Sequence, residues 1–430
     1  MTIAEQLPPG IARGAAGTAS FGGVDLAALA QAYGTPLLAF DGELFDQSVA
    51  AFRSAFGPQT DISYAAKAFL CIALARRVAS RGLTLDVCSL GELRTAQAAA
   101  FPADGLRFHG CGKYDAELEA ALAAGVGRIV VDNEEELERV ECAAARLRRR
   151  APILLRVNTG IEAHTHEMVR TAGESSKFGM LPPRALAAAL RAAASGNLHV
   201  HGLHSHIGSQ IYEPRFFSDA LEPLFELAAA LHGEGVAVSE LVAGGGFAVR
   251  YAPDHEAPPS PADLAGRLLA ALQTGARSAG VPVPQLGIEP GRALVGEAGL
   301  SLYRVLSVKN HGSKRFAIVD GSIADNPRPA LYGSYHHALL AGRRSAARER
   351  ETTVCGRSCE ADLLVTCPLA EDLQAGDLLA ICTTGAYTYS MASNYNRFAK
   401  PPVVLVESGR HHLWVRRERD DETLRYDVDT

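Results

Sequence analysis

Residues 128–158, RIVVDNEEELERVECAAARLRRRAPILLRVN, contain the unit from which we predict the architecture. Short β-type runs lie at its two ends, RIVVD at 128–132 and ILLRVN at 153–158. Between them, the apolar residues of NEEELERVECAAARLRRR recur at three- and four-residue steps, which is the spacing of an amphipathic helix. A strand, a helix and a second strand in this order favour a parallel sheet with helices packed on its face.

The same alternation extends in both directions, from about residue 60 to residue 291. Helix candidates such as GELRTAQAAA, DAELEAALAAG and PPRALAAALRAAA separate the β-type runs. The other runs are ISYAAKA (62–68), LTLDVCS (83–89), LRFHG (106–110), LHVHGLHSHIG (198–208), ELVAGGG (240–246) and QLGIEPG (285–291). Eight β-type runs in strict alternation with helices predict a (β/α)8 barrel. A doubly wound open sheet is the competing architecture, but the GxGxxG motif usual in its first turn is absent.

The sequence changes character after about residue 297. Runs such as SLYRVLSVKN, KRFAIVDG, DLLVTCPLA, GDLLAICTTGAY, PPVVLVE and HHLWVRRE predict strands separated by Gly, Pro and charged turns. We therefore expect a second, β-rich domain with a barrel-like or sandwich-like form. The predicted division is an N-terminal segment (1–42) that contributes to the β domain, the (β/α)8 barrel (43–297) and the C-terminal β domain (298–430).

Length and composition suit a globular protein of more than one core. The 430 residues are 47% hydrophobic and 21% charged, and the formal net charge of −6 gives no support for binding to nucleic acid or to an anionic membrane. The start, MTIAEQLPPGIARGAAG, lacks the pattern of a secretory signal, and no run of 18 apolar residues occurs. None of the eight cysteines forms a CxxC pair, so we expect a reduced, cytoplasmic protein.

The stretch SYAAKAF (63–69) carries Lys67 near the end of an apolar run. A surface lysine at a strand end is the ordinary interpretation, because a buried lysine needs a paired charge or a lowered pKa. In a (β/α)8 barrel, however, reactive groups lie at the C-terminal ends of the strands. The polar residues at those ends are Lys67, Asp86, His109, Asp132, Asn158, His206, Gly244 to Gly246, Glu289 and Arg292. Each alone could be a turn residue or a helix cap, but together they predict a pocket that contains Lys67.

Glycine-bearing turns follow the last two predicted strands, GGGF at 244–247 and EPGR at 289–292. Such turns are typical of a barrel phosphate site, although glycine triplets also form ordinary turns. A lysine, a phosphate site and a carboxylate in one barrel mouth indicate pyridoxal 5′-phosphate (PLP), with the lysine forming the Schiff base and the acid keeping the pyridine nitrogen protonated. A Schiff-base aldolase without a cofactor is the alternative, but it needs neither the glycine turns nor Glu289.

From about residue 35 to residue 420, the sequence resembles diaminopimelate decarboxylases, PLP enzymes of the alanine-racemase and ornithine-decarboxylase fold type. The motifs are YAAKAF, LDVCSLGEL, FHGCGKYDAELEAAL, RVNTGIEAHTHE, SSKFGM, HSHIGSQI, GGGFAVRY, EPGRALV, DGSIADNPRPALYG and TTGAYTYSMASNYNRFAKPP. The resemblance implies decarboxylation of meso-2,6-diaminopimelate to L-lysine, the last step of lysine biosynthesis. The alternatives are a PLP-dependent decarboxylase of another amino acid or specialised-pathway intermediate, a racemase, and a non-catalytic PLP-binding homologue.

The resemblance also implies a role for each matching residue. Lys67 would form the Schiff base, His206 would stack on the cofactor ring, and Glu289 would pair with the pyridinium nitrogen. The remaining cofactor contacts would be Asp86, Arg156, Ser209, Gly245, Gly246, Gly291, Arg292 and Tyr387, and the substrate contacts Arg292, Arg328, Tyr332, Glu360 and Tyr387. No metal site is expected, because CGRSC (355–359) has no second cysteine pair.

The family further places a Cys-Glu pair of the partner subunit over the cofactor, matched here by Cys359 and Glu360, which implies a homodimer with shared active sites. A free thiol can return a proton to the reacting carbon, and a carboxylate can hold a distal ammonium group; two packing cysteines, Cys355 and Cys359, are the ordinary alternative. The family usually continues Cys-Glu-Ser-Gly-Asp, whereas this chain reads CEADLL, which motivates the alternative substrate. The polar stretch 164–179 is interpreted as a lid or, alternatively, as a surface loop.

Overall fold

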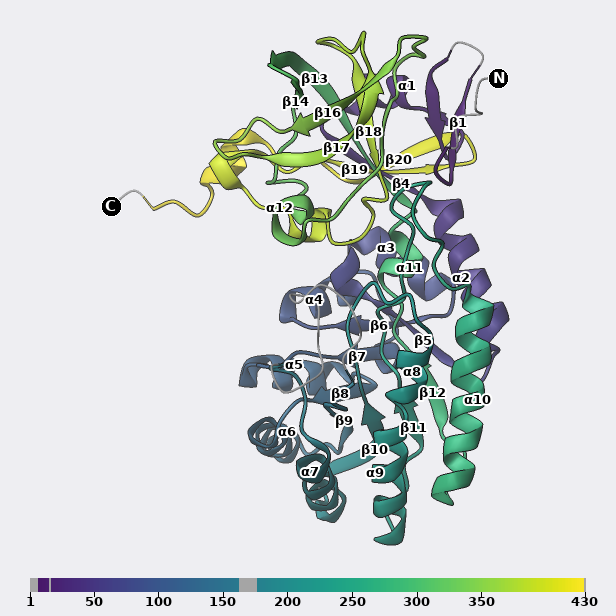
Figure 1. Ribbon diagram of the computed structural model, residues 1–430. Coiled ribbons are helices and arrows are strands. Elements are labelled where there is room, and N and C mark those ends of the chain that lie inside the picture. The colour runs from purple at the N-terminus through teal and green to yellow at the C-terminus, as the bar shows by residue number, and fades with distance from the viewer. Residues whose placement is uncertain (1–6, 15–16, 162–175, 429–430) are drawn as a thin grey trace. The chain divides into compact units, whose positions relative to one another are not determined.

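The computed structural model describes residues 7–14, 17–161 and 176–428, and these residues form two compact units (Figure 1). The barrel unit comprises residues 49–248 and 258–293. The β unit comprises residues 1–48, 249–257 and 294–430. The predicted fold class, a (β/α)8 barrel with a second β-rich domain, is confirmed.

The barrel unit contains a closed sheet in which neighbouring strands run parallel. Its strands are β5 (Asp61–Ala65), β6 (Thr84–Val87), β7 (Leu106–Phe108), β8 (Arg128–Val131), β9 (Ala151–Arg156), β10 (Leu198–His204), β11 (Glu240–Val242) and β12 (Gln285–Ile288). The helices around it are α3 (Ile72–Ser80), α4 (Leu90–Ala98), α5 (Asp115–Ala124), α6 (Glu134–Arg146), α7 (Pro182–Ala194), α8 (Arg215–Asp219), α9 (Glu222–Gly233) and α10 (Pro261–Ala279). Hydrogen bonds between β12 and β5 close the barrel.

Local sequence explains where several of these helices begin. The side chains of Asn133, Ser89 and Ser260 accept hydrogen bonds from backbone N–H groups in the first turns of α6, α4 and α10. Pro261 occupies the first position of α10, where its missing N–H is not needed. These caps place each helix directly after a short turn from the preceding strand or loop, so the strand ends remain close to the helix N-termini.

The β unit contains a three-stranded sheet and a nine-stranded sheet. The small sheet is formed by β1 (Ile11–Arg13), β2 (Ala19–Phe21) and β3 (Val24–Asp25), followed by α1 (Leu26–Tyr33). The large sheet contains β4 (Leu37–Asp41), β13 (Gly299–His311), β14 (Lys314–Val319), β15 (Ala338–Leu340), β16 (Glu349–Cys355), β17 (Leu363–Ala370), β18 (Leu378–Cys382), β19 (Val403–Glu407) and β20 (Arg410–Val415). Strand β4 from the N-terminal segment pairs with both β13 and β19. Two helices join the units in sequence, α2 (Gly42–Phe56) and α11 (Arg292–Val295), and α12 (Arg328–Tyr332) follows β14.

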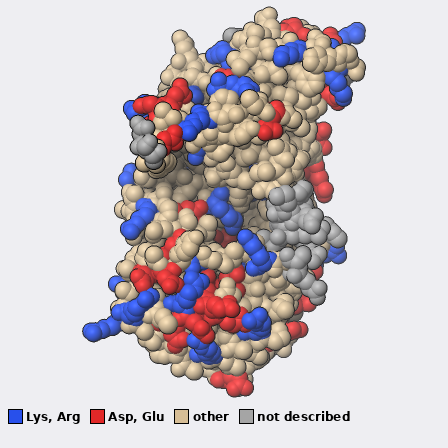
Figure 2. All heavy atoms as spheres, turned by 90° about the vertical axis from the view of Figure 1, so that its left-hand side faces the viewer, with Lys and Arg blue, Asp and Glu red and all other residues tan. Residues whose placement is uncertain are grey.

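The helices on one face of the barrel unit carry interspersed acidic and basic side chains (Figure 2). Among the helices of this unit, Arg191 of α7 pairs with Glu138 and Glu141 of α6, both at 3.1 Å. Exposed pairs of this kind contribute little to stability, because water and salt screen them. In the described parts of the chain, no helix combines the length and the apolar character needed to cross a membrane.

A buried charge network lies among the first residues of several barrel strands. The Arg107 guanidinium of β7 is 2.5 Å from the Glu240 carboxylate of β11, and it also pairs with Asp61 of β5. Glu240 accepts a second bond from Arg128 Nε at 2.9 Å, and its side chain is 2% exposed. Burial alone would raise the pKa of Glu240, but the two arginines lower it below its usual value of 4.5.

We therefore expect Glu240→Gln to lower the free energy of unfolding by about 3 kcal/mol at neutral pH, because it leaves buried arginine charge uncompensated. A carboxylate with a depressed pKa stabilises the fold above its unfolded pKa and loses this contribution as pH falls through its folded pKa. The difference between wild type and variant should therefore shrink below the usual pKa of 4.5. Urea unfolding at several pH values measures this difference in the free energy of unfolding. The exposed Glu138→Gln is the control, with an expected effect under about 0.5 kcal/mol; equal effects of the two variants would contradict the prediction.

Candidate active site

A cavity of about 500 Å³ lies at the C-terminal ends of the barrel strands. The predicted residues Lys67, Arg156, His206 and Glu289 all line it. Lys67 lies in a 3-10 turn directly after β5, Arg156 ends β9, and Glu289 follows β12. A larger cavity of about 890 Å³, between α8, α9 and α10, contains none of the predicted site residues. The chemistry predicted from the strand ends therefore converges in the smaller cavity.

Two lysines line this cavity, and their environments differ. Lys113 is 3% exposed, and its ammonium donates to Gly110 O (2.8 Å), Val130 O (2.7 Å) and Glu136 Oε1 (2.6 Å). These three acceptors match the three protons of an ammonium group, so Lys113 is a structural residue. Lys67, in contrast, is exposed on the cavity wall. The ordinary interpretation, a surface lysine at a strand end, is correct that Lys67 is exposed. Its side chain, however, is exposed to the cavity.

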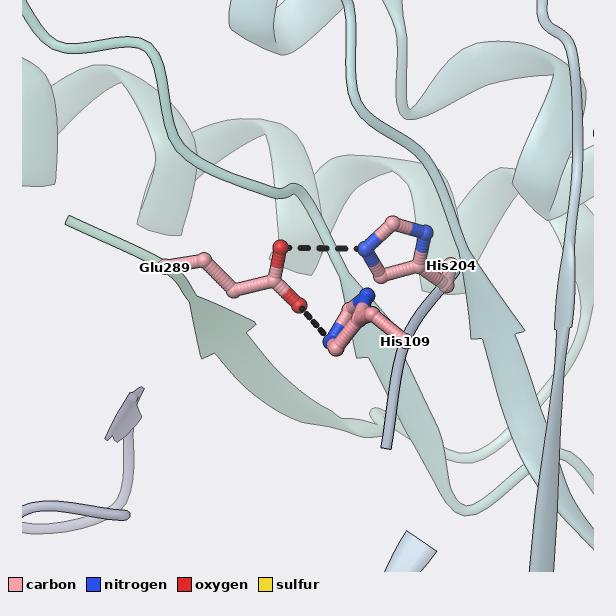
Figure 3. A group of neighbouring side chains, drawn as sticks. All are labelled: His109, His204 and Glu289. Atoms are coloured by element: carbon pink, nitrogen blue, oxygen red, sulfur yellow. Dashed lines mark hydrogen bonds and ion pairs between the residues drawn. The ribbon is translucent and has the colours of Figure 1, made fainter. Parts of the chain in front are cut away.

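Glu289 is held between two histidines (Figure 3). His204 Nε2 lies 3.0 Å from Glu289 Oε2, and His109 Nε2 lies 3.3 Å from Glu289 Oε1. Burial would raise the pKa of the Glu289 carboxyl, but the two histidines hold it well below its usual value. Glu289 is therefore a buried carboxylate that stays ionised. Burial lowers the pKa of His204 to about 4, so this ring is neutral and its Nε2–H donates to Glu289.

Asp86 joins the same cluster through His109. His109 Nε2 is 3.6 Å from Asp86 Oδ1, and the Ser63 hydroxyl donates to this oxygen. Burial and the nearby Glu289 raise the pKa of Asp86. Burial would lower the pKa of His109, but Glu289 and Asp86 raise it. His109 thus lies between two carboxyl groups, which favour its charged form.

His206 is a neutral ring on the cavity wall. Its Nδ1 accepts a hydrogen bond from Gly245 N–H at 3.0 Å, so Nδ1 carries no proton. Burial, and then the positive charge of Lys67, lower the pKa of His206 well below its usual value. Although the ring keeps some exposure in the cavity, the protein around it disfavours the charged form.

The glycines after β11 have no room for side chains. A Cβ on Gly245 would clash with the carbonyl oxygen of Glu289, and one on Gly246, where φ is +101°, would clash with that of Gly208. Near this turn, the Arg292 guanidinium donates to Ser209 Oγ at 2.9 Å. The glycine backbone fits the phosphate of PLP, the accessible lysine fits its aldehyde, and the ionised carboxylate fits its ring nitrogen.

Gly291 belongs to the barrel unit, where an added Cβ would lie 3.0 Å from that of Ala65. The β unit contains five further predicted residues, Arg328, Tyr332, Cys359, Glu360 and Tyr387. The Arg328 guanidinium lies 5.2 Å from the ring centre of Tyr332 and 5.6 Å from that of Tyr387, so these three residues cluster. Cys359 and Glu360 are exposed on the loop between β16 and β17. Of the predicted lid, 164–179, residues 164–175 lie outside the described residues. Phe178, near the end of this stretch, lines the barrel cavity, and the Arg156 guanidinium lies 4.4 Å from its ring centre.

The sequence patterns do not identify three residues at the site, His204, Lys113 and Glu136. His204 was not singled out, although HSHIG places it two residues before His206 and therefore on the same face of an extended strand. Lys113 and its partner Glu136 were also missed, because 23 residues separate them in the sequence. His109 was noted only as a polar strand end, without its contact to Glu289.

A closed parallel barrel with a lysine, an ionised carboxylate and a glycine turn at its strand ends defines the class of PLP-binding barrels. The family described as pyridoxal-dependent decarboxylase, pyridoxal binding domain, matches residues 43–296. Diaminopimelate decarboxylase of Halalkalibacterium halodurans is 41% identical, over 96% of this chain and 95% of that protein. The crystal structure of the M. jannaschii enzyme of that name with L-lysine has a TM-score of 0.92 at 28% identity, over 98% of both chains. That of the Helicobacter pylori enzyme with L-lysine has a TM-score of 0.87 at 31% identity, over 93% of this chain and 98% of that chain. The chain therefore belongs to the diaminopimelate decarboxylase family, and the resemblance noted in the sequence is confirmed.

Proposed function

We propose that the protein decarboxylates meso-2,6-diaminopimelate to L-lysine and CO2 with PLP as cofactor, the last step of lysine biosynthesis. The observation that carries the proposal is the cavity in which Lys67, Glu289 and His206 meet. The 41% identity to a relative of that name over 96% of this chain supports the substrate. The two solved relatives that hold L-lysine support the product.

When bound, PLP supplies a ring that accepts the electron pair left behind when CO2 leaves. Lys67 would hold the cofactor through its amine and give way to the amine of the substrate. The residues that would hold the phosphate are Ser209, Gly245, Gly246, Gly291 and Tyr387. Asp86 and Arg156 would border the cofactor from the ends of β6 and β9.

Glu289 would set the protonation of the cofactor ring. Its carboxylate stays ionised, so it can keep a proton on the ring nitrogen as negative charge develops during the reaction. The hydrogen bond from His204 fixes the orientation of this carboxylate at 3.0 Å. His206 is neutral and would stack its ring face on the cofactor without adding positive charge.

Two arginine guanidinium groups and one glutamate carboxylate would bind the two ends of the substrate. Arg292 and Arg328 suit the retained carboxylate because a guanidinium binds carboxylates bidentately, and Tyr332 and Tyr387 would line the same end. Glu360 of the partner subunit would bind the distal ammonium group. The thiol of Cys359 of the partner subunit, or the Lys67 ammonium, would return a proton to the carbon that has lost CO2.

The experiment that tests this function measures CO2 release and product chirality from PLP-loaded protein. Meso-diaminopimelate, lysine, ornithine and arginine are offered separately. We expect rapid turnover of diaminopimelate alone, with L-lysine as the product. PLP absorbance without turnover of diaminopimelate would contradict the proposal and favour another amino acid, with the CEADLL stretch as the first place to look.

A homodimer with shared sites is part of the proposal, and mixing two inactive variants tests it. Lys67→Ala is expected to lose activity, and so is Cys359→Ala where the partner's thiol, rather than the Lys67 ammonium, returns the proton. Each site then needs Lys67 of one subunit and Cys359 of the other. After the two variants exchange subunits, each mixed dimer has one intact site, so about a quarter of the wild-type rate should return. Unmixed variants taken through the same exchange are the controls. No recovery in verified mixed dimers would place both residues in one subunit's site.

The compartment is proposed to be the cytoplasm. All eight cysteines are free thiols in the structure, and Cys359 needs its thiol for the proposed proton transfer. Free thiols persist in the reducing cytoplasm, whereas oxidising compartments favour disulfides.

A further inference from the structure

The Cys-Glu loop, which we define as residues 356–362, is held by side chains of a second segment of the β unit. Tyr395 Oη donates to Glu360 Oε1 at 2.7 Å, and Cys359 N–H donates to Asn396 Oδ1 at 2.9 Å. Two neighbouring residues of a 3-10 turn thus hold the two neighbouring residues of the loop. The contacts differ in kind, because Asn396 holds the backbone whereas Tyr395 holds the carboxylate itself.

The base of the Cys-Glu loop is fixed separately. The buried Asp362 accepts from Ser358 N–H at 2.6 Å and from Ile323 N–H at 2.5 Å. Gly356 completes this base, because a Cβ there would press against Asp362 Oδ2 and the backbone of Ser322. The base of the Cys-Glu loop is therefore anchored without Tyr395, so the Tyr395 contact is not needed to hold this part of the backbone.

The backbone around these contacts is strained. Asp362, Asn396 and Arg397 have φ values of +53°, +52° and +57°, in the left-handed region that non-glycine residues seldom occupy. Backbone strain of this kind gathers where a site needs a particular geometry. Asp362 follows the Cys359–Glu360 pair in the sequence, and Asn396 accepts the hydrogen bond from Cys359 N–H, so two of the strained residues lie next to the pair.

We propose that Tyr395 is a specificity-determining positioning residue, which orients the Glu360 carboxylate toward a distal ammonium group of the substrate. This inference rests on the proposed function, in which Glu360 binds that ammonium group. With Oε1 accepting from Tyr395, the second oxygen, Oε2, is the one directed to the ammonium group. Tyr395 suits this role because the hydrogen bond to Glu360 raises its pKa, so the phenol remains a donor.

The test is a double-mutant cycle with Tyr395→Phe and Glu360→Gln, assayed with meso-diaminopimelate. Tyr395→Phe should raise KM about 10-fold and change kcat less than about twofold, because the orienting bond to a charged group is lost. Glu360→Gln should raise KM about 100-fold, and the double variant should match it within about twofold, because Tyr395 acts through Glu360. Tyr426→Phe, at a tyrosine 81% exposed, is the control and should behave as wild type. The midpoint of thermal unfolding should be unchanged in Tyr395→Phe.

The outcomes separate this inference from the proposed function. Absence of wild-type turnover would reject the function itself. An unchanged KM in Glu360→Gln would reject the role of Glu360 and the inference with it. A large effect of Glu360→Gln, together with an unchanged KM in Tyr395→Phe or with additive effects in the double variant, would overturn the inference alone.

Discussion

Replacing Lys67 with alanine is expected to lower kcat by about 10⁴-fold, because the residue that would bond to the cofactor is then missing. Borohydride treatment of PLP-loaded wild type should fix the cofactor on the peptide that contains Lys67, and the variant should show no such label. Lys67 is the lysine exposed in the barrel cavity, whereas the ammonium of Lys113 is bound by three acceptors. Steady-state kinetics and peptide mapping therefore give two independent measurements.

Lys67→Arg is the matched control, because it retains a positive charge but cannot form the same bond. It should lose activity as completely as Lys67→Ala, which would separate the covalent role from the electrostatic one. A label on Lys113, or more than about a tenth of the wild-type kcat in either variant, would contradict the assignment of Lys67.

Glu289→Gln is expected to lower kcat by about 10²- to 10³-fold, because a preorganised charge next to the reacting system is lost. The amide has the same shape but cannot supply the negative charge that would keep the ring nitrogen protonated. The borohydride label on Lys67 should persist, because Glu289 would act on the ring nitrogen of the cofactor and not on its bond to the Lys67 amine. Because its pKa is held well below its usual value, Glu289 is ionised throughout the neutral pH range in which kcat is measured.

Glu240→Gln is the control for this prediction, because it removes the charge of another buried barrel carboxylate that does not line the cavity. It should cost stability but leave kcat within about twofold of wild type under conditions where the protein is folded. Glu289→Asp, which keeps the charge on a shorter side chain, should retain more activity than Glu289→Gln. Equal kcat values for Glu289→Gln and wild type would remove Glu289 from the proposed chemistry.

Local patterns in the sequence were sufficient for the barrel and for part of the site. A helix shows as a period of three to four residues and a strand as a short apolar run, and both patterns are formed by residues close in the sequence. The strands from 62 to 291 could therefore be expected before any contact was known. The parallel alternation then placed Lys67, His109, His206 and Glu289 at strand ends of the same barrel mouth. Motif resemblance supplied the roles that periodicity cannot carry, such as those of Arg328 and Glu360.

Contacts between distant segments required the tertiary structure. Nothing in the local sequence pairs His204 with Glu289, which is 85 residues further along, or shows that Lys113 is buried and bound to Glu136 whereas Lys67 is exposed in the cavity. The bond from Tyr395 to Glu360 likewise joins residues 35 positions apart. Such partners are set by barrel closure, strand register and side-chain packing, which depend on the whole chain. Backbone propensity and periodicity act between neighbours, so they determine the elements and the strand ends, whereas only the folded chain determines which charged groups meet.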